Sequence, residues 1–395
     1  AGSVTVERKV GAPPAEVYRY FTKSTLIAEW LCDVALATAH PGGRVYFGWT
    51  DGAGVVGNFT ELQPSEKVGF TWSGTGIPGP GEVAIVLTPD GKGTKVALTH
   101  SWTGDGDHAE GVTARWERGL ENLASVMETG HDLRFTLRPM MGVMVDGELT
   151  PERAAKEGIP VQAGVVIGSA SEGMGAHAAG LTGGDAITSL GGTPINGFAS
   201  IPVALQPHRA GETVEVVFYR GAEEHRVPMT LSGRPMPEVP ATAHALAGLV
   251  RELFDWVDAE LAACFEGADE PEAMAKPTPE EWSAREVVAH LLDGEGDYHA
   301  YIAELVQGVE RIADGPLDNS ELRVRVTAGS YTGYREMLES YKRLEEQTVA
   351  LLAGLPDEFV ARKGSFWRLA YGYTQARPHY EEHFAQIRAA IESAR

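Results

Sequence analysis

The sequence predicts a multidomain α+β protein, in which two segments rich in strands precede an all-helical one. Three observations support this prediction. The chain has 395 residues, more than one hydrophobic core usually organises. Strand-like alternation recurs up to about residue 231, whereas apolar residues after a proline-rich stretch follow helical spacing. We therefore expect domains at 1–130, 131–234 and 242–395, with a linker at 235–241.

The chain is strongly acidic, with a formal net charge of −22. Such a surface repels phosphate backbones and anionic lipids, so we expect neither nucleic acid nor a membrane as a partner. No secretory signal and no apolar run long enough to span a bilayer is evident in the sequence. Cys32 and Cys264 are its only cysteines, which favours a cytoplasmic protein without a disulfide framework.

The first segment, 1–130, combines strand and helix signals. Val4–Val10 alternates as a strand, two short helices are expected up to Trp30, and a long amphipathic helix closes the segment. Between them lie further runs with strand character, separated by turn residues, and Pro89-Asp90-Gly91 predicts a hairpin. These runs are 43–47, 55–62, 67–72, 82–87 and 94–99.

Two motifs add detail to this pattern. Trp116, Leu120 and Leu123 share one face of the closing helix, and Pro41-Gly42-Gly43 precedes a strand. The segment resembles the START-related (SRPBCC) helix-grip fold, in the branch related to activators of the heat-shock-protein-90 ATPase. The resemblance implies a curved sheet and a long helix around an apolar cavity, and hence a small apolar ligand. The alternative is that the tryptophans of this segment simply fill its core.

The second segment, 131–234, alternates strands with short helices. Ala179-Gly180-Leu181, Gly184-Asp185-Ala186-Ile187 and the pair Gly191-Gly192 resemble pieces of a PDZ domain, a small β-barrel or sandwich. Helices are predicted at 176–181 and 198–206. Strands are predicted at 133–137, 141–145, 164–167, 184–192, 210–221 and 226–231.

The PDZ resemblance implies a peptide-binding groove. In that family, backbone N–H groups of a loop bind the carboxylate of a peptide or protein C-terminus, and the peptide adds a strand to the sheet edge. Met141 stands where the family often has glycine. No histidine is evident on the groove helix, so we expect a preference for peptides with an apolar side chain. The alternative is that this chain fills its own groove. The matching loop is Met141, Gly142, Val143 and Met144, and the matching helix positions are Ser200, Ile201 and Leu205.

Beyond the linker, amphipathic helices predict an all-α up-and-down four-helix bundle. The helices are expected at 242–264, from residue 283 onward, at 331–352 and from residue 376 onward. Ser283 and Glu286 form a capping box at the start of the second helix. A long connection with a break at Gly315-Pro316 precedes the third helix, and a loop with Phe366, Trp367 and Tyr371 precedes the fourth.

The fourth helix carries a pair of histidines, His379 and His383. Four residues advance a helix by about 400°, so both imidazoles lie on one face. Two neutral imidazoles at this spacing can share a divalent metal if a third ligand comes from another helix. On the second helix, His290 lies at the edge of the inward stripe. His299 lies about 180° around that helix from His290, which excludes it as a ligand.

The strings Trp282-Ser283-x3-Val287-x2-His290-Leu291 and His379-x3-His383-x2-Gln386-Ile387 resemble the DinB/YfiT superfamily. The resemblance implies a four-helix bundle whose metal ligands are His290, His379 and His383. It implies a divalent metal, with zinc or nickel expected, and an open coordination position. Dimers are frequent in that superfamily, so a homodimer is also considered.

Members of the superfamily are implicated in thiol-dependent transfer to small electrophiles. Glu295 and Glu382 are candidate carboxylates near the site, although Glu382 should point about 100° away from His383. The first functional hypothesis is therefore a metal-dependent thiol S-transferase, or a former enzyme, whose catalytic residues are not identified. The alternative is a non-catalytic scaffold that binds a ligand and a peptide, or a stress or co-chaperone-like protein, with histidines that hold no metal.

Overall fold

The structure is a computed structural model that describes residues 1–49, 52–74, 80–104, 108–309 and 320–395. It forms two compact units, one of Ala1–Gly130 with Pro237–Arg395 and one of His131–Met236. Antiparallel sheets occupy the first and second segments, and the C-terminal region is helical. The predicted α+β class is confirmed.

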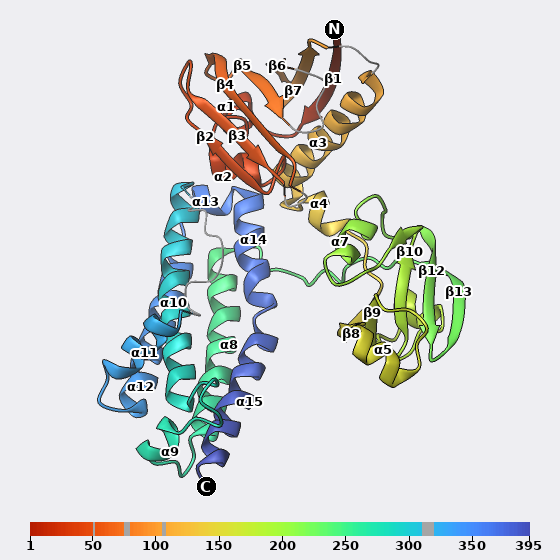
Figure 1. Ribbon diagram of the computed structural model, residues 1–395. Helices are drawn as coiled ribbons and strands as arrows, with labels where there is room; N and C mark the ends of the chain where they lie inside the picture. Colours follow the sequence, from red (N-terminus) through yellow and green to blue (C-terminus); the bar gives the residue numbers. More distant parts are fainter. Residues whose placement is uncertain (50–51, 75–79, 105–107, 310–319) are drawn as a thin grey trace. The chain divides into compact units, whose positions relative to one another are not determined.

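The first segment folds as an antiparallel sheet against one long helix (Figure 1). Its described strands follow the order β1-β7-β6-β5-β4-β3-β2, as expected for a meander that closes on its first strand. Gly91, with φ +64°, turns β6 into β7 where a side chain would be strained. The elements are β1 (Gly2–Val10), α1 (Pro14–Arg19), α2 (Ser24–Ala28), β2 (Val34–Ala37), β3 (Arg44–Gly48), β4 (Gly54–Gln63), β5 (Lys67–Gly74), β6 (Gly81–Asp90), β7 (Gly93–Trp102) and α3 (Ala109–Thr129).

Aromatic side chains fill the space between this sheet and α3. Trp30, Trp72 and Trp116 are each 1% exposed. A cavity lined by Trp30, Trp116, Phe47 and Phe70, among others, has a volume of about 10 Å³, which is the space that about one water molecule needs. An apolar ligand would therefore enter this cavity only if aromatic side chains moved.

His100 lies within this aromatic core and is 2% exposed. Its Nδ1 accepts a hydrogen bond of 3.0 Å from Nε1 of Trp116, and its ring contacts Trp72 and Trp102. Burial, helped by the positive charge of Arg115, lowers the pKa of His100 to about 4. The imidazole is therefore neutral at pH 7.

The second unit contains one antiparallel sheet with the strand order β13-β12-β10-β9-β8, and β11 pairs with β10. β8 lies at one end of this order, so one of its edges is not paired within the described sheet. The elements are α4 (Leu133–Thr136), β8 (Val143–Glu148), α5 (Pro151–Glu157), β9 (Val165–Ala170), α6 (Gly175–Ala178), β10 (Ala186–Leu190), β11 (Thr193–Pro194), α7 (Ser200–Leu205), β12 (Thr213–Arg220) and β13 (Glu223–Thr230).

The prediction of a strand at Leu133–Leu137 is wrong, because Leu133–Thr136 form the short helix α4. Asp132 is its N-cap and accepts a hydrogen bond of 2.9 Å from the backbone amide of Arg134. The same carboxylate binds the Arg134 guanidinium at 2.7 Å. This local closure satisfies the amides at the start of a helix, and it outweighs a short alternating pattern.

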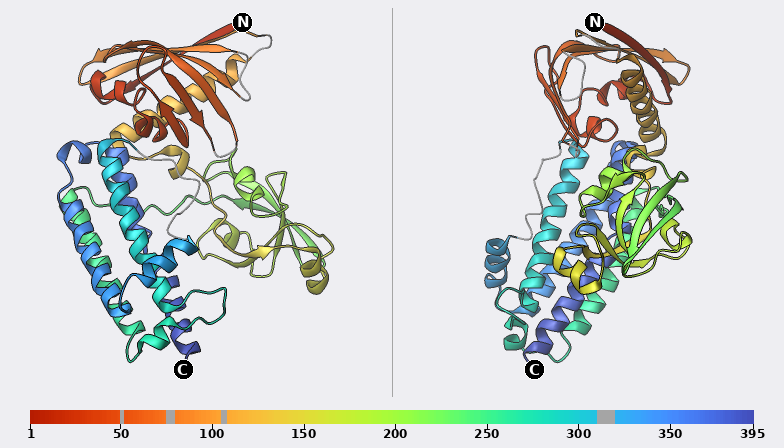
Figure 2. Two further views of the ribbon diagram at one scale, coloured as in Figure 1. Left: turned by 60° about the vertical axis from the view of Figure 1, so that its left-hand side comes forward. Right: turned by 45° about the vertical axis from the view of Figure 1, so that its right-hand side comes forward.

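The third segment follows residues 233–240, which form no helix or strand, and consists of helices (Figures 1 and 2). The long helices α8, α10, α12 and α15 pack side by side around one apolar core. None of the described helices combines the length and apolar character needed to cross a bilayer. The elements are α8 (Ala243–Cys264), α9 (Glu270–Met274), α10 (Ala284–Gln307), α11 (Glu321–Gly329), α12 (Tyr334–Ala353), α13 (Asp357–Val360), α14 (Lys363–Thr374) and α15 (Arg377–Ser393).

The loop predicted around Phe366, Trp367 and Tyr371 is wrong, because these residues lie in helix α14. Its buried residues Phe366, Leu369 and Tyr373 recur with helical spacing. The break expected at Gly315-Pro316 falls outside the described residues. In contrast, the capping box of Ser283 and Glu286 is confirmed, with both reciprocal bonds present.

Helix α14 also packs against α3 within the first unit. Ser365 donates a hydrogen bond to the buried carboxylate of Glu29, and Arg368 lies 3.6 Å from the same carboxylate. A side chain at Gly364 would approach Glu29 and Val126 to 2.7 Å. Glycine therefore permits this close contact between α14 and the first segment.

We expect a decrease in pH from 7 to 5 to destabilise the first domain through His100. Its folded-state pKa near 4 is below the value of about 6.5 of an unfolded histidine, so the unfolded chain binds more protons between these values. This contribution is complete above about pH 6.5 and is lost as the pH falls toward 4. The loss amounts to about 2 kcal/mol at pH 5. Urea unfolding followed by tryptophan fluorescence measures the loss.

His100→Gln keeps an acceptor for Trp116 and removes the titrating group, so it should flatten this part of the pH dependence. His40 is exposed, and His40→Gln should keep the wild-type dependence. Equal pH dependence in the wild type and His100→Gln would contradict this account.

Candidate metal centre

Two helices bring three histidines together. His290 comes from α10, and His379 and His383 come from α15, which packs against α10. Their ring centroids are separated by 5.7 Å (His290–His379), 4.7 Å (His290–His383) and 4.4 Å (His379–His383). One ring nitrogen from each residue lies within 4.8 Å of the others. Modest side-chain rotations would reach the separation set by metal–nitrogen bonds of about 2 Å.

The local sequence determines how the three side chains are exposed. The capping box at Ser283 fixes the start of α10, and Pro378 lies in the first turn of α15. His379 is in that same first turn and is exposed, whereas His290 and His383 are 3% and 6% exposed. Two histidines of the cluster are therefore buried, and the third lies at the surface, where a small molecule can approach.

His383 is poised as a neutral acceptor. Its Nδ1 lies 2.9 Å from Oε1 of Gln386, so Nδ1–H donates and Nε2 keeps its lone pair. Burial lowers the pKa of His383 to about 4; the bond to Gln386 opposes this shift, and His379 and His290 add to it. Nε2 is buried and has no hydrogen-bond partner among the described residues. A divalent metal would satisfy this nitrogen, so the residues fit such an ion.

The other side chains considered from the sequence lie elsewhere. Nε2 of His299 is 2.6 Å from the hydroxyl of Thr348, and His299 does not belong to the three-histidine group. Glu295 is buried and accepts a hydrogen bond from the same hydroxyl. Glu382 is exposed, and its charge raises the pKa of His383 slightly against the effect of burial.

The predicted carboxylate loop of the second unit leads into β8. Met141 is buried in the core, and its carbonyl accepts from Ala176. Gly142 has a φ of +78°, and a side chain there would collide with Met174. Val143 begins the strand, and Met144 is 65% exposed beside it.

The three groove positions predicted on α7 differ in their surroundings. Ser200 uses its hydroxyl within the preceding turn, where it donates to the carbonyl of Gly197. Leu205 is buried in the core, and Ile201 packs against that core while partly buried. Phe198 and Val203, which were not selected from the sequence, are 48% and 58% exposed.

Sequence reasoning assigned no role to two polar residues of the bundle. Gln386 belongs to the motif quoted above, and in the structure it orients the ring of His383. Glu345 is 2% exposed, and the sequence does contain a signal for it. It continues the helical spacing of the buried residues Met337 and Tyr341 on α12, so a carboxylate occupies a core position.

Comparisons with known families match three successive stretches of the chain. Residues 11–128 match the family described as activator of Hsp90 ATPase homolog 1-like protein, residues 139–231 match the PDZ domain, and residues 253–387 match the DinB superfamily. These families suggest ligand binding, peptide binding and metal binding in general terms.

Two curated relatives are serine proteases named Do-like HtrA from Lactococcus lactis. The protein of subspecies lactis is 34% identical over 99 residues, which are 24% of this chain and 24% of that protein. The protein of subspecies cremoris is 32% identical over 115 residues, 28% of each chain. The chain thus spans about a quarter of the length of these relatives.

Similar solved structures include a protein of Mesorhizobium loti, 24% identical with a TM-score of 0.30, which covers 32% of this chain and 97% of its own. A protein of Chromobacterium violaceum is 27% identical with a TM-score of 0.29 and coverages of 32% and 96%. The Aha1 dimer from Colwellia psychrerythraea is 21% identical with a TM-score of 0.30 and coverages of 32% and 97%. The chain is a fusion of an Hsp90-ATPase-activator-like domain, a PDZ domain and a DinB-superfamily bundle, in this order.

Proposed function

We propose that the C-terminal bundle binds a divalent metal, zinc or nickel, through His290, His379 and His383, and acts as a thiol S-transferase on small electrophiles. The observation that carries the proposal is the convergence of three imidazoles from two helices. The buried Nε2 of His383 has no hydrogen-bond partner among the described residues, which supports a metal ion as the partner of its lone pair.

A divalent ion at this centre would supply Lewis acidity, which lowers the pKa of a thiol in its open position. The chain's own residues prepare that position. His383 presents a neutral ring with a lone pair, and Gln386 prevents the ring from turning over. Trp282 packs against His290 with ring centroids 5.2 Å apart. The exposure of His379 leaves the solvent side open to a thiol and its acceptor.

Peptide binding by the PDZ domain is a second candidate function. It is supported by the unpaired edge of β8, where a peptide could add a strand. Phe198, next to the start of α7, donates its amide to Glu148 of β8 at 2.8 Å. Exposed apolar side chains, Met144 on β8 and Val203 on α7, occur on both of these elements. An apolar C-terminal residue is the expected peptide feature.

Purified protein should contain about one divalent metal per chain, and His290→Ala should lose most of it because only two imidazoles remain. Metal content is measured by mass spectrometry, and transfer is measured as thiol consumption with an electrophile such as an alkyl halide. His244 is exposed on α8, so His244→Ala is the matched control. Unchanged metal content in His290→Ala would refute the site, and a metal-loaded protein without transfer would refute the enzyme.

Gln386→Leu should lower the affinity for zinc about 10–100-fold, because the ring of His383 loses the acceptor that orients it. Competition with a chromogenic chelator measures the dissociation constant. Glu382→Gln alters an exposed neighbour and should change the affinity much less. Equal affinities in the wild type and Gln386→Leu would show that this hydrogen bond does not support a metal ligand.

A peptide with an apolar C-terminal residue and a free carboxylate should bind the full chain. Amidation of its C-terminus should weaken binding about tenfold or more, because it removes a charged acceptor for the loop amides. Val203→Asp should weaken binding similarly, and Met274→Asp, at an exposed site outside this unit, should not. Fluorescence anisotropy measures these affinities, and indifference to amidation would contradict carboxylate capture.

A further inference from the structure

One segment of the chain closes most of the cavity in the helix-grip domain. Five of the eight described residues that line the cavity belong to residues 20–31, which contain α2 and are called the α2 wall below. The other three belong to β3, β5 and α3. The residues that the α2 wall contributes are Tyr20, Phe21, Ile27, Trp30 and Leu31.

The cavity is too small for a ligand while the α2 wall stays in place. Its volume is about 10 Å³, whereas pockets for small molecules measure about 300–1,000 Å³. Withdrawal of the α2 wall would remove five side chains at once and open the space between the sheet and α3. Access to this cavity therefore depends on what holds the α2 wall.

A carboxylate of the α2 wall is bound by the helical bundle. Glu29 directly precedes Trp30, and its side chain is 2% exposed. It accepts a hydrogen bond from Ser365 of α14, whose side chain is also buried. Arg368, three residues further along α14, lies 3.6 Å from the same carboxylate. The bundle thus supplies both a hydrogen bond and a positive charge to the α2 wall.

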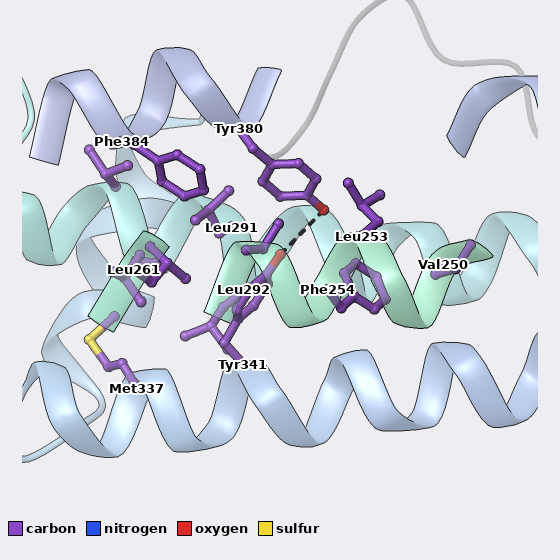
Figure 3. Close-up of a cluster of buried hydrophobic side chains, with 14 of the residues drawn as sticks. Val250, Leu253, Phe254, Leu261, Leu291, Leu292, Met337, Tyr341, Tyr380 and Phe384 are labelled. Carbon is purple, nitrogen blue, oxygen red and sulfur yellow. Dashed lines mark hydrogen bonds between the residues drawn. The ribbon is translucent and has the colours of Figure 1, made fainter. Parts of the chain in front are cut away.

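Helix α14 is itself held from two other sides. Lys363 in its first turn donates to the backbone carbonyl of Glu128 in α3, the helix that lines the cavity through Trp116. The buried apolar residues of α14 belong to the core that it shares with α8, α10, α12 and α15, part of which is drawn in Figure 3. Helix α14 therefore links the α2 wall to α3 and to the bundle.

The contact between Glu29 and α14 is suited to opening. Burial removes water from the carboxylate, and the hydrogen bond and the guanidinium offset that cost. If the α2 wall moves away from α14, water returns to the carboxylate and to Arg368, whose side chain is already 34% exposed. The open state therefore leaves neither charge in an apolar environment.

We propose that Glu29, Ser365 and Arg368 form a latch through which the bundle holds the helix-grip cavity closed, and that an uncharged apolar molecule enters when the latch opens. The class of ligand follows from the lining, which consists of aromatic and aliphatic side chains. Ligand uptake and docking of α14 on the α2 wall then oppose each other, so each weakens the other by the same factor. The latch does not require a metal at the three histidines.

The test measures how tightly the full chain binds N-phenyl-1-naphthylamine, an uncharged aromatic probe that fluoresces in apolar surroundings. Arg368→Ala leaves the buried carboxylate of Glu29 without this cation, so the latch should open more often. The dissociation constant of the probe should then fall about tenfold, because the binding-competent state is more populated. Gly364→Val should act in the same direction through sterics, since a Cβ at Gly364 would approach Glu29 and Val126 to 2.7 Å.

Matched variants separate the latch from a general loss of stability. Gly248→Val places a side chain on α8 where a Cβ has no neighbour within 4 Å among the described residues, and it should bind the probe as the wild type does. Addition of Glu29→Gln to Arg368→Ala removes the uncompensated charge and keeps an acceptor for Ser365. This double variant should recover the affinity of the wild type.

Hydrogen exchange measured by mass spectrometry locates the opening. In Gly364→Val, the amides of residues 20–31 should exchange several-fold faster, and those of β6 and β7 should keep their wild-type rates. The proposal is overturned if folded Arg368→Ala and Gly364→Val bind the probe no more tightly than the wild type. It is also overturned if Glu29→Gln does not reverse the effect of Arg368→Ala, which would show that the buried charge does not control access.

Discussion

The candidate metal site depends on the packing of α15 against α10. One face of α15 has two tasks, because it fills the bundle core with Phe384 and Ile387 and also presents His383 toward His290. Apolar burial therefore holds the imidazoles together, although a group of neutral rings gains little from its own proximity. A shift of α15 along α10 by one turn would move the histidines by about 5 Å and separate them.

The sequence predicted elements well wherever a periodic pattern had an explicit start signal. Helix α10 is the clearest example, since its capping box and inward stripe both appear in the structure. Prediction failed where a local bond competed with the pattern, as at α4, where Asp132 closes a helical turn on a segment that alternates like a strand. It also failed at α14, where the aromatic and glycine content concealed helical spacing.

The candidate metal centre was only partly accessible to sequence reasoning. The spacing of His379 and His383 places them on one face of a helix from geometry alone. Their meeting with His290 depends on how two helices pack, and here the family resemblance provided what periodicity could not. Neither approach indicated Gln386 as the partner of His383, because the orientation of a ring is decided by side-chain contacts that leave no periodic trace.

Unmet polar groups differ between the two parts of the first unit, and this difference bears on where function resides. In the helix-grip domain, buried N–H groups of Trp72 and His100 have no hydrogen-bond partner among the described residues. These groups are donors, which a cation cannot satisfy. In the bundle, Nε2 of His383 is a buried acceptor without a hydrogen-bond partner in the described part of the chain. A buried acceptor costs stability unless a donor or a cation compensates for the lost water. Because this acceptor lies beside two further imidazoles, the bundle rather than the aromatic core carries the candidate metal site.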